Sequence, residues 1–329
     1  MHLGLLDQQY YVRQPVPEGE QGLSRSRSWI RQGRVRESRL WTQSLCHVSS
    51  PPPDSRWVVV ADRGADIYEH LLACQERGLG FVVRACQDRG LVGTRQQLFS
   101  VARSQPVAGQ FCLTIRSSPT RSARRTTLAV SFSPPLALRA PQRPGTNAGK
   151  GQSVTVSVVR VWEPGSQLEW LLLCNEAVSS FAQARERAWQ YATRWLIEDF
   201  HKALKTGLGA ERLQLHTGHR LFAAVALLSV VDFALVDLRE QSRQQSEAPI
   251  EQIGWPSLYL HVLSHYQQQP INTVGQAYDA LAKLGGHLGR SKDAPPGWQT
   301  LWRGLLHLRH LIVGWRLAIR STISSSRQK

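Results

Sequence analysis

One stretch in the second half of the chain combines an aromatic residue, two cations and a carboxylate at a spacing that could serve phosphate chemistry. Tyr191, Arg194, Glu198 and Lys205 lie ahead of Gly207, a residue that commonly ends helices. On one continuous helix, at about 100° per residue, the four would share an arc of roughly 60° and a stripe roughly 21 Å long. Such a mixture suits a surface that binds phosphates and a metal ion, and a solvated polar helix face is the alternative.

A second carboxylate follows a short apolar run. The run 57–61 ends at Asp62, and open α/β sheets place their ligand groups at the carboxyl ends of strands. Carboxylate oxygens are the ligands that Mg²⁺ prefers. The alternative for Asp62 is the N-cap of the next helix, although Asp66 is the better candidate for that cap.

These residues need an α/β scaffold around them. Residues 57–61 predict a strand, 66–77 a helix that ends at Gly78, and 81–84 a second, parallel strand. Residues 3–13 carry strand formers, so the chain is expected to begin inside a strand. We expect the strand before Asp62 to have an unpaired side.

The rest of the chain changes from strand to helix patterns. Alternating segments predict strands at 111–116, 127–132, 154–162 and 170–174, separated by basic loops. Helical spacing follows at 182–206, 220–239, 273–284 and 301–319, with a polar linker at 241–252. The apolar run 221–231 is shorter than the roughly 20 residues of a membrane span, which predicts a buried core helix and no membrane partner.

Composition indicates a polyanionic partner. The 329 residues favour about two domains, and 40 Lys and Arg against 24 Asp and Glu give a formal net charge of +16. Nucleic acid is the commonest partner for such a surplus. The five cysteines lie far apart and the N-terminus lacks the pattern of a signal peptide, so we expect a cytoplasmic protein with reduced thiols.

The spacing Tyr, two residues, Arg, three residues, Glu, six residues, Lys resembles the YREK signature of the DDE transposases of the insertion-sequence-four group. Further similar segments are 62–67, 81–84, 170–173, 194–195, 200–203, 205–207, 209–212 and 280–286, followed by 297–298, 301–302 and Gly304. The resemblance covers nearly the whole chain.

The resemblance implies an α/β fold with an RNase H-like catalytic core, an inserted β-subdomain and a C-terminal all-helical dimerisation region. We expect a partial core at 1–90, the β-subdomain at 91–178, the core helix with the signature at 179–219 and the helical region at 220–329. It also implies cut-and-paste transposition, in which DNA cleavage, hairpin formation and strand transfer use two Mg²⁺, or Mn²⁺, about 4 Å apart.

The resemblance assigns catalysis and metal binding to Asp62 and Glu198. It assigns contacts with transposon-end and target DNA to the following residues: Tyr191, Arg194, Lys202, Lys205 and Arg84 for phosphates, and Trp170 for stacking on a flipped base. For each cation a solvated side chain is the alternative, and for Trp170 it is core packing.

Several neighbouring residues receive no site role. We expect Asp199, which points about 100° away from Glu198, to be structural or solvated, and His201 to take no part in catalysis. The arginine-rich stretch Arg25, Arg27, Arg31, Arg34, Arg36 and Arg39 could follow DNA or form a solvated linker.

The chain departs from the family at its N-terminus, where the strand carrying the first catalytic aspartate is not matched. Asp7 falls in the segment that matches the edge strand and does not replace it. We therefore expect this chain to be catalytically inactive alone. The alternative function is a non-catalytic protein that pairs with full-length transposase through 220–329 and inhibits it; a repair nuclease of the same fold would not require the signature.

Overall fold

The computed structural model describes residues 4–12, 15, 37–115, 124–141, 153–290 and 293–326. The chain divides into two compact units, which we treat separately. The N-terminal unit is Leu6–Trp195, and the helical unit is Leu196–Lys329 together with Met1–Leu5. The fold is mixed α/β, as the sequence predicts.

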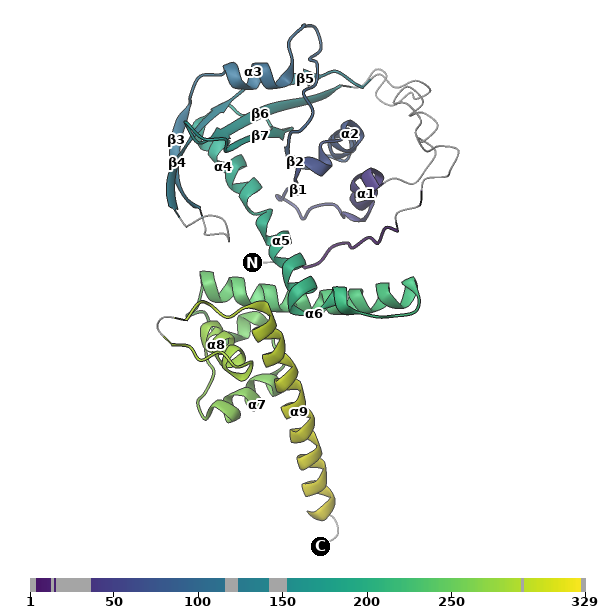
Figure 1. The fold of residues 1–329 in the computed structure, drawn as a ribbon, viewed down its shortest axis with the longest axis vertical. Helices are drawn as coiled ribbons and strands as arrows, with labels where there is room; N and C mark the ends of the chain where they lie inside the picture. The colour runs from purple at the N-terminus through teal and green to yellow at the C-terminus, as the bar shows by residue number, and fades with distance from the viewer. Residues whose placement is uncertain are drawn as a thin grey trace. The chain divides into compact units, whose positions relative to one another are not determined.

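The N-terminal unit is built on a seven-stranded mixed sheet with the order β1-β2-β7-β6-β4-β3, and β5 pairs with β6 (Figure 1). Its strands are β1 (Val58–Ala61), β2 (Gly80–Arg84), β3 (Gly109–Ile115), β4 (Arg124–Phe132), β5 (Leu136–Leu138), β6 (Val154–Trp162) and β7 (Glu169–Cys174). Its helices are α1 (Glu37–Ser44), α2 (Tyr68–Glu76), α3 (Leu98–Ser104) and α4 (Phe181–Ala192), with 3-10 turns at Leu45–His47 and Arg63–Ala65.

The predicted strand–helix–strand unit is confirmed. β1 and β2 pair in parallel with α2 between them in the chain, and in the described residues β1 is the edge strand, with β2 as its partner. β2 then pairs antiparallel with β7, so the alternating strands continue the same sheet. The boundary between a core and a β-subdomain near residue 90 stays a prediction.

Strand alternation divides the apolar side chains between the two faces of the sheet. Val83 and Leu173 belong to the core cluster that includes residues of α2 and α3. Val82 and Leu172 belong to the other cluster, which includes Tyr191 and other residues of α4. Because each face is covered by helices, the central strands are apolar at successive positions.

The helical unit contains α5 (Trp195–Lys202, which begins at the unit boundary), a π-helical turn (Ala203–Gly207), a 3-10 turn (Ala210–Arg212), α6 (Gly218–Gln244), a 3-10 turn (Ile250–Ile253), α7 (Ser257–Gln267), α8 (Val274–Leu284) and α9 (Trp298–Ser326). A capping box of Thr273 and Gln276 starts α8. Leu263, Leu281 and Leu301 are fully buried in the core shared by α7, α8 and α9. The predicted linker 241–252 is shorter than expected, because α6 extends to Gln244.

Three predictions about secondary-structure elements are wrong. Residues 4–12 form neither strand nor helix, so the expected strand at 3–13 is absent over that range. The helix expected at 182–206 is interrupted, since α4 ends at Ala192 and α5 begins at Trp195. The run 221–231 is not a buried helix: of its residues, Leu227 is 71% and Val230 is 66% exposed.

Helix α6 combines this exposed apolar surface with one deeply buried carboxyl group, Asp232. By length and composition alone, α6 could cross a membrane, and 28% of its most apolar window is buried. A core helix of a soluble protein passes the same test, so the sequence expectation of no membrane partner stays a prediction.

Candidate nucleic-acid and metal site

The N-terminal unit brings Trp170, Tyr191 and Arg194 together. The rings of Trp170 and Tyr191 meet edge to face, with their centroids 5.3 Å apart. The Arg194 guanidinium carbon lies 5.6 Å from the Tyr191 ring and 5.3 Å from the Trp195 ring. Aromatic faces combined with a guanidinium are suited to stacking nucleic-acid bases.

These side chains differ in their exposure to solvent. Tyr191 is 3% exposed, Trp170 and Arg194 are half-buried, and Trp195 is exposed. The buried Tyr191 ring supports Trp170, and the phosphate contact predicted for Tyr191 stays a prediction.

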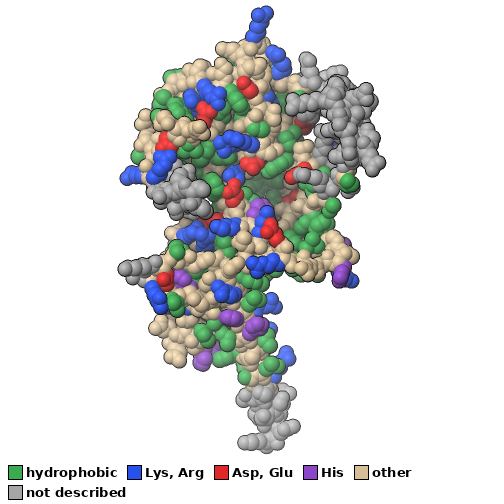
Figure 2. All heavy atoms as spheres, viewed as in Figure 1, with side chains coloured by type: hydrophobic (Ala, Val, Ile, Leu, Met, Phe, Trp, Pro, Cys, Tyr) green, Lys and Arg blue, Asp and Glu red, His purple; other side chains and the backbone are tan. Residues whose placement is uncertain are grey.

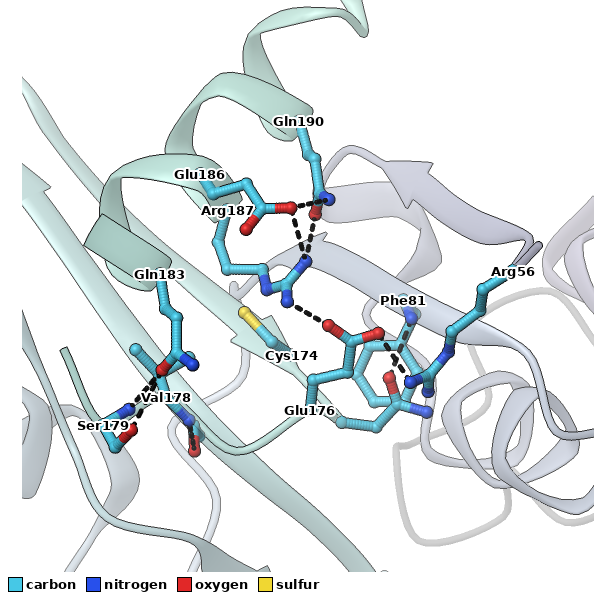
Figure 3. A network of polar contacts seen from close by, with 12 residues as sticks. Arg56, Phe81, Cys174, Glu176, Val178, Ser179, Gln183, Glu186, Arg187 and Gln190 are labelled. Carbon is cyan, nitrogen blue, oxygen red and sulfur yellow. Dashed lines mark hydrogen bonds and ion pairs between the residues drawn. The ribbon is translucent and has the colours of Figure 1, made fainter. Parts of the chain in front are cut away.

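A polar network fixes α4, which carries Tyr191, against the sheet (Figure 3). The Arg187 guanidinium pairs with Glu176 and donates a hydrogen bond of 2.8 Å to the Gln190 side chain. Glu176 in turn pairs with Arg56, just before β1, at 2.7 Å. Because Arg187 is buried, its charge requires this pairing, and the network holds α4 to the segments around β7 and β1.

A second group of ion pairs fixes the start of β7, where Trp170 lies. The Glu169 carboxylate accepts hydrogen bonds from Arg103 at 2.7 Å and Arg160 at 2.8 Å. The hydrogen bond from Arg103, and then that from Arg160, lowers the pKa of Glu169, although partial burial opposes this shift. Arg84 donates to the Glu169 backbone carbonyl at 2.9 Å, which places this predicted DNA contact beside Trp170.

Sequence reasoning missed Glu169 and its two arginines. Glu169 directly precedes Trp170, but its partners lie on α3 and β6, and no local spacing connects them. The only available signal was a carboxylate next to Trp170 at the start of an apolar strand.

Asp62 lies at the exposed carboxyl end of β1, as predicted. One of its oxygens accepts the Gly64 backbone N–H at 2.8 Å and so caps the 3-10 turn Arg63–Ala65. The expectation that Asp66 is the cap is wrong. Asp66 is buried, pairs with Arg89, and accepts the backbone N–H groups of Cys86 and Gln87 at 2.6 and 2.8 Å.

In the helical unit, α5 presents Glu198 and Lys202 as exposed side chains. Asp199 pairs with Arg239 at 3.7 Å, in agreement with the structural one of the two roles, structural or solvated, expected for it. The His201 side chain reaches the surface, although neighbouring atoms partly shield its ring from water. This desolvation, and then the charge of Lys205, lowers the pKa of His201, whereas Glu198 opposes the shift.

The signature does not lie on one continuous helix. Arg194 lies in a turn, where the Thr193 hydroxyl donates to the Gln190 carbonyl at 2.7 Å. Lys205 lies in the π-helical turn, in which the Leu208 N–H donates to the Ala203 carbonyl at 2.9 Å. The predicted 60° arc therefore does not apply, although the helix ends at Gly207 as expected. Such π turns often occur at functional sites.

Lys205 makes one weak ion pair. Its ammonium group lies 3.6 Å from Glu211, and both side chains are more than half exposed. Exposed pairs of this kind contribute about 0–1 kcal/mol, so Lys205 can exchange Glu211 for a phosphate at little cost.

The donor atoms of Asp62 and Glu198 suit Mg²⁺, a hard cation that prefers carboxylate oxygens. Asp62 belongs to the N-terminal unit and Glu198 to the helical unit. Within the described residues, no group of three or more His, Cys, Asp or Glu side chains is placed to hold a metal ion. Asp62 and Glu198 are each exposed on their own unit, and their role as metal ligands stays a prediction.

A hollow of about 1020 Å³ in the N-terminal unit lies away from these residues. It is lined by residues of α1, α2 and the loops after β2 and β5, among them Arg39, Asp66, Arg89 and Arg139. Its charges are mixed and Asp66 is already paired, so we assign it no function. Arg25, Arg27, Arg31, Arg34 and Arg36 of the arginine-rich stretch lie outside the described residues.

Basic side chains are distributed over the visible face of both units, with acidic side chains among them on the N-terminal unit (Figure 2). All five cysteines are free. No model of a known protein family matches this chain. Function is therefore inferred from the site geometry together with the sequence resemblance.

Proposed function

We propose that the chain is a DNA-acting protein of the DDE transposase class, whose reaction is Mg²⁺-dependent strand cleavage and transfer. The observation that carries the proposal is the cluster of Trp170, Tyr191 and Arg194, with Arg84 bonded beside Trp170. A half-exposed indole whose neighbours Glu169 and Tyr191 each contact an arginine offers a base-stacking face near phosphate contacts. Core packing alone would not require Arg84 bonded to the Glu169 carbonyl and Arg194 against the Tyr191 ring.

Each residue has a separate task in this proposal. Trp170 stacks on an unpaired base, Tyr191 supports the indole, and Arg84, Arg194, Lys202 and Lys205 contact phosphates. Asp62 and Glu198 would hold Mg²⁺, which when bound supplies Lewis-acid activation of a phosphoryl group.

The stacking role can be tested by comparing two DNA substrates. A duplex with one unpaired base should bind wild-type chain more tightly than a fully paired duplex. Trp170→Ala should remove most of this preference, worth about 1–3 kcal/mol for one stacked base. Trp255→Ala, on a half-buried tryptophan of the helical unit, is the matched control. Equal preference in Trp170→Ala and wild type would exclude base stacking on Trp170.

The metal role can be tested without turnover, by replacing Mg²⁺ with Fe²⁺ in the presence of ascorbate and peroxide. Hydroxyl radicals formed at bound iron cut the backbone near its ligands. We expect cuts near Asp62 and Glu198 that Mg²⁺ suppresses, and their loss in Asp62→Asn and Glu198→Gln. Glu251→Gln, an exposed carboxylate on another element, is the control. An unchanged cleavage pattern in both Asp62→Asn and Glu198→Gln would reject the metal assignment.

Exposed apolar residues favour a second candidate, a non-catalytic protein that pairs with full-length transposase and inhibits it. On α9 of the helical unit, Val313 is 55% and Leu317 is 60% exposed. Apolar positions four residues apart on an exposed helix are suited to a helix–helix contact. Co-purification with full-length transposase that is lost in Leu317→Glu would support it, and a lack of association would exclude it.

A further inference from the structure

Helix α7 carries two histidines one turn apart, His261 and His265, both exposed. Their ring centroids lie 6.1 Å apart and their planes are tilted by only 23°. Each ring also meets Trp315 of α9 edge to face, at 5.1 Å for His261 and 5.2 Å for His265. All three residues belong to the helical unit, on whose visible face Figure 2 shows several histidines.

The surroundings of the two rings are fixed by the backbone. Val262 and Leu263 between them are buried, which orients this face of α7 outward. The helix ends at Gln267, and Gln268 follows it with φ 54°. The chain then returns so that the Gln269 N–H donates to the Ser264 carbonyl at 3.2 Å. The result is an open hollow of about 520 Å³, lined by His261, Ser264, His265, Gln268, Gln269 and Pro270.

We propose that His261 and His265 bind one borderline transition-metal ion of the Zn²⁺, Ni²⁺ or Cu²⁺ class. Imidazole nitrogens suit these ions, and two histidines at positions i and i+4 of a helix are a known arrangement for chelation. No third His, Cys, Asp or Glu of the described residues joins the pair, so water completes the coordination. The site does not suit Mg²⁺, which prefers oxygen, and is therefore independent of the proposed transposase chemistry.

The competing explanation is that both imidazoles only pack against the indole. Packing and metal binding differ in one respect that can be measured. A two-ligand chelate fails when either histidine is removed, whereas packing on Trp315 does not depend on a metal ion. Trp315 also reports on the site, because Ni²⁺ and Cu²⁺ quench an adjacent indole.

The test is calorimetric titration of the untagged full-length chain with Ni²⁺ in millimolar Mg²⁺, followed by tryptophan fluorescence. We expect binding of one ion, weakened at least about tenfold in both His261→Gln and His265→Gln. His310→Gln, an exposed histidine of α9, is the control and should bind as wild type does. Trp315→Phe should keep the binding but lose most of the quenching. Failure of wild type to bind Ni²⁺, or full affinity in either single variant of the pair, would overturn the proposal.

Discussion

At the scale of single residues, Asp232 of α6 is 0% exposed, and neither of its oxygens has a hydrogen-bond partner among the described residues. Burial raises its pKa to about 8, far above the roughly 3.9 of an unfolded aspartate. Between these two values the folded state holds one proton more than the unfolded state. Stability therefore falls as pH rises through this window, by up to about 1.4 kcal/mol per pH unit, and levels off above pH 8.

Replacing Asp232 by leucine should remove this pH dependence. Urea unfolding at pH 5 and pH 8 measures the free energy of unfolding, and Asp232→Leu should stabilise more at pH 8 than at pH 5. Asp279→Leu, on an exposed carboxylate of α8, should show no such difference. A wild-type free energy of unfolding that is constant between the two pH values would contradict the buried, protonated state.

The ion pair of Arg187 with Glu176 is also buried enough to be tested, with side chains 11% and 20% exposed. Removing one partner leaves an uncompensated charge, so Glu176→Leu should destabilise by about 3–5 kcal/mol. Arg187→Met combined with Glu176→Leu should recover most of that loss, because an apolar pair needs no desolvation. Chemical denaturation of the two single variants and the double variant measures the coupling. If the double variant loses as much stability as the two single variants together, the two charges do not depend on each other.

At the scale of elements, α8 and α9 cross where two glycines let their backbones approach. A methyl group at Gly304 would overlap the Leu281 carbonyl oxygen, and one at Gly285 would overlap the Thr300 carbonyl oxygen. Gly304→Ala should therefore destabilise the helical unit by about 1–3 kcal/mol, despite the better helix propensity of alanine. Gly314→Ala, ten residues later in α9, meets no atom within 4 Å and should stabilise by about 0.5–1 kcal/mol. Thermal unfolding of both variants checks the opposite signs, and equal effects would contradict the close crossing.

The elements that sequence predicts well are those whose signal is local. The alternation of apolar and polar residues predicted the strands that end at Phe132 and Trp162, and the apolar run before Asp62 predicted β1. In these segments the two-residue period of a strand matches the pattern of buried side chains. The pairing of Val83 with Leu173 was beyond sequence reasoning, since no local pattern connects β2 with β7. The interruption after α4 was missed because neither Gly nor Pro marks it; the Thr193 hydroxyl competes for a helix carbonyl instead.

The candidate site follows the same division. The positions of Asp62 at a strand end and of Glu198 on a helix were readable, because each depends on a few adjacent residues. The burial of Tyr191 was not readable, since it depends on Trp170 of another element. The exposure of Leu227 was missed because an apolar residue type shows only that burial is favourable. It does not show that another element covers the side chain.

At the scale of the whole molecule, the 40 Lys and Arg overstate the number of cations that could contact DNA. Arg103 and Arg160 share Glu169, and Arg124 pairs with Glu163, so these three guanidinium groups are already engaged in ion pairs. Arg84 and Arg194 beside Trp170, with Lys202 and Lys205 in the helical unit, are the proposed phosphate contacts. Because each contact releases condensed counterions, four contacts predict a slope of log affinity against log salt of roughly −3 to −4.

Single substitutions test whether these contacts account for that slope. Lys202→Ala and Lys205→Ala should each reduce its magnitude by about 1, whatever the DNA sequence. Lys283→Ala, an exposed lysine of α8 outside the proposed site, should leave the slope unchanged. Fluorescence anisotropy of a labelled duplex over a salt series measures all four proteins. An equal reduction in Lys283→Ala would mean that DNA contacts the chain through its general positive charge, and the proposed set of phosphate contacts would be wrong.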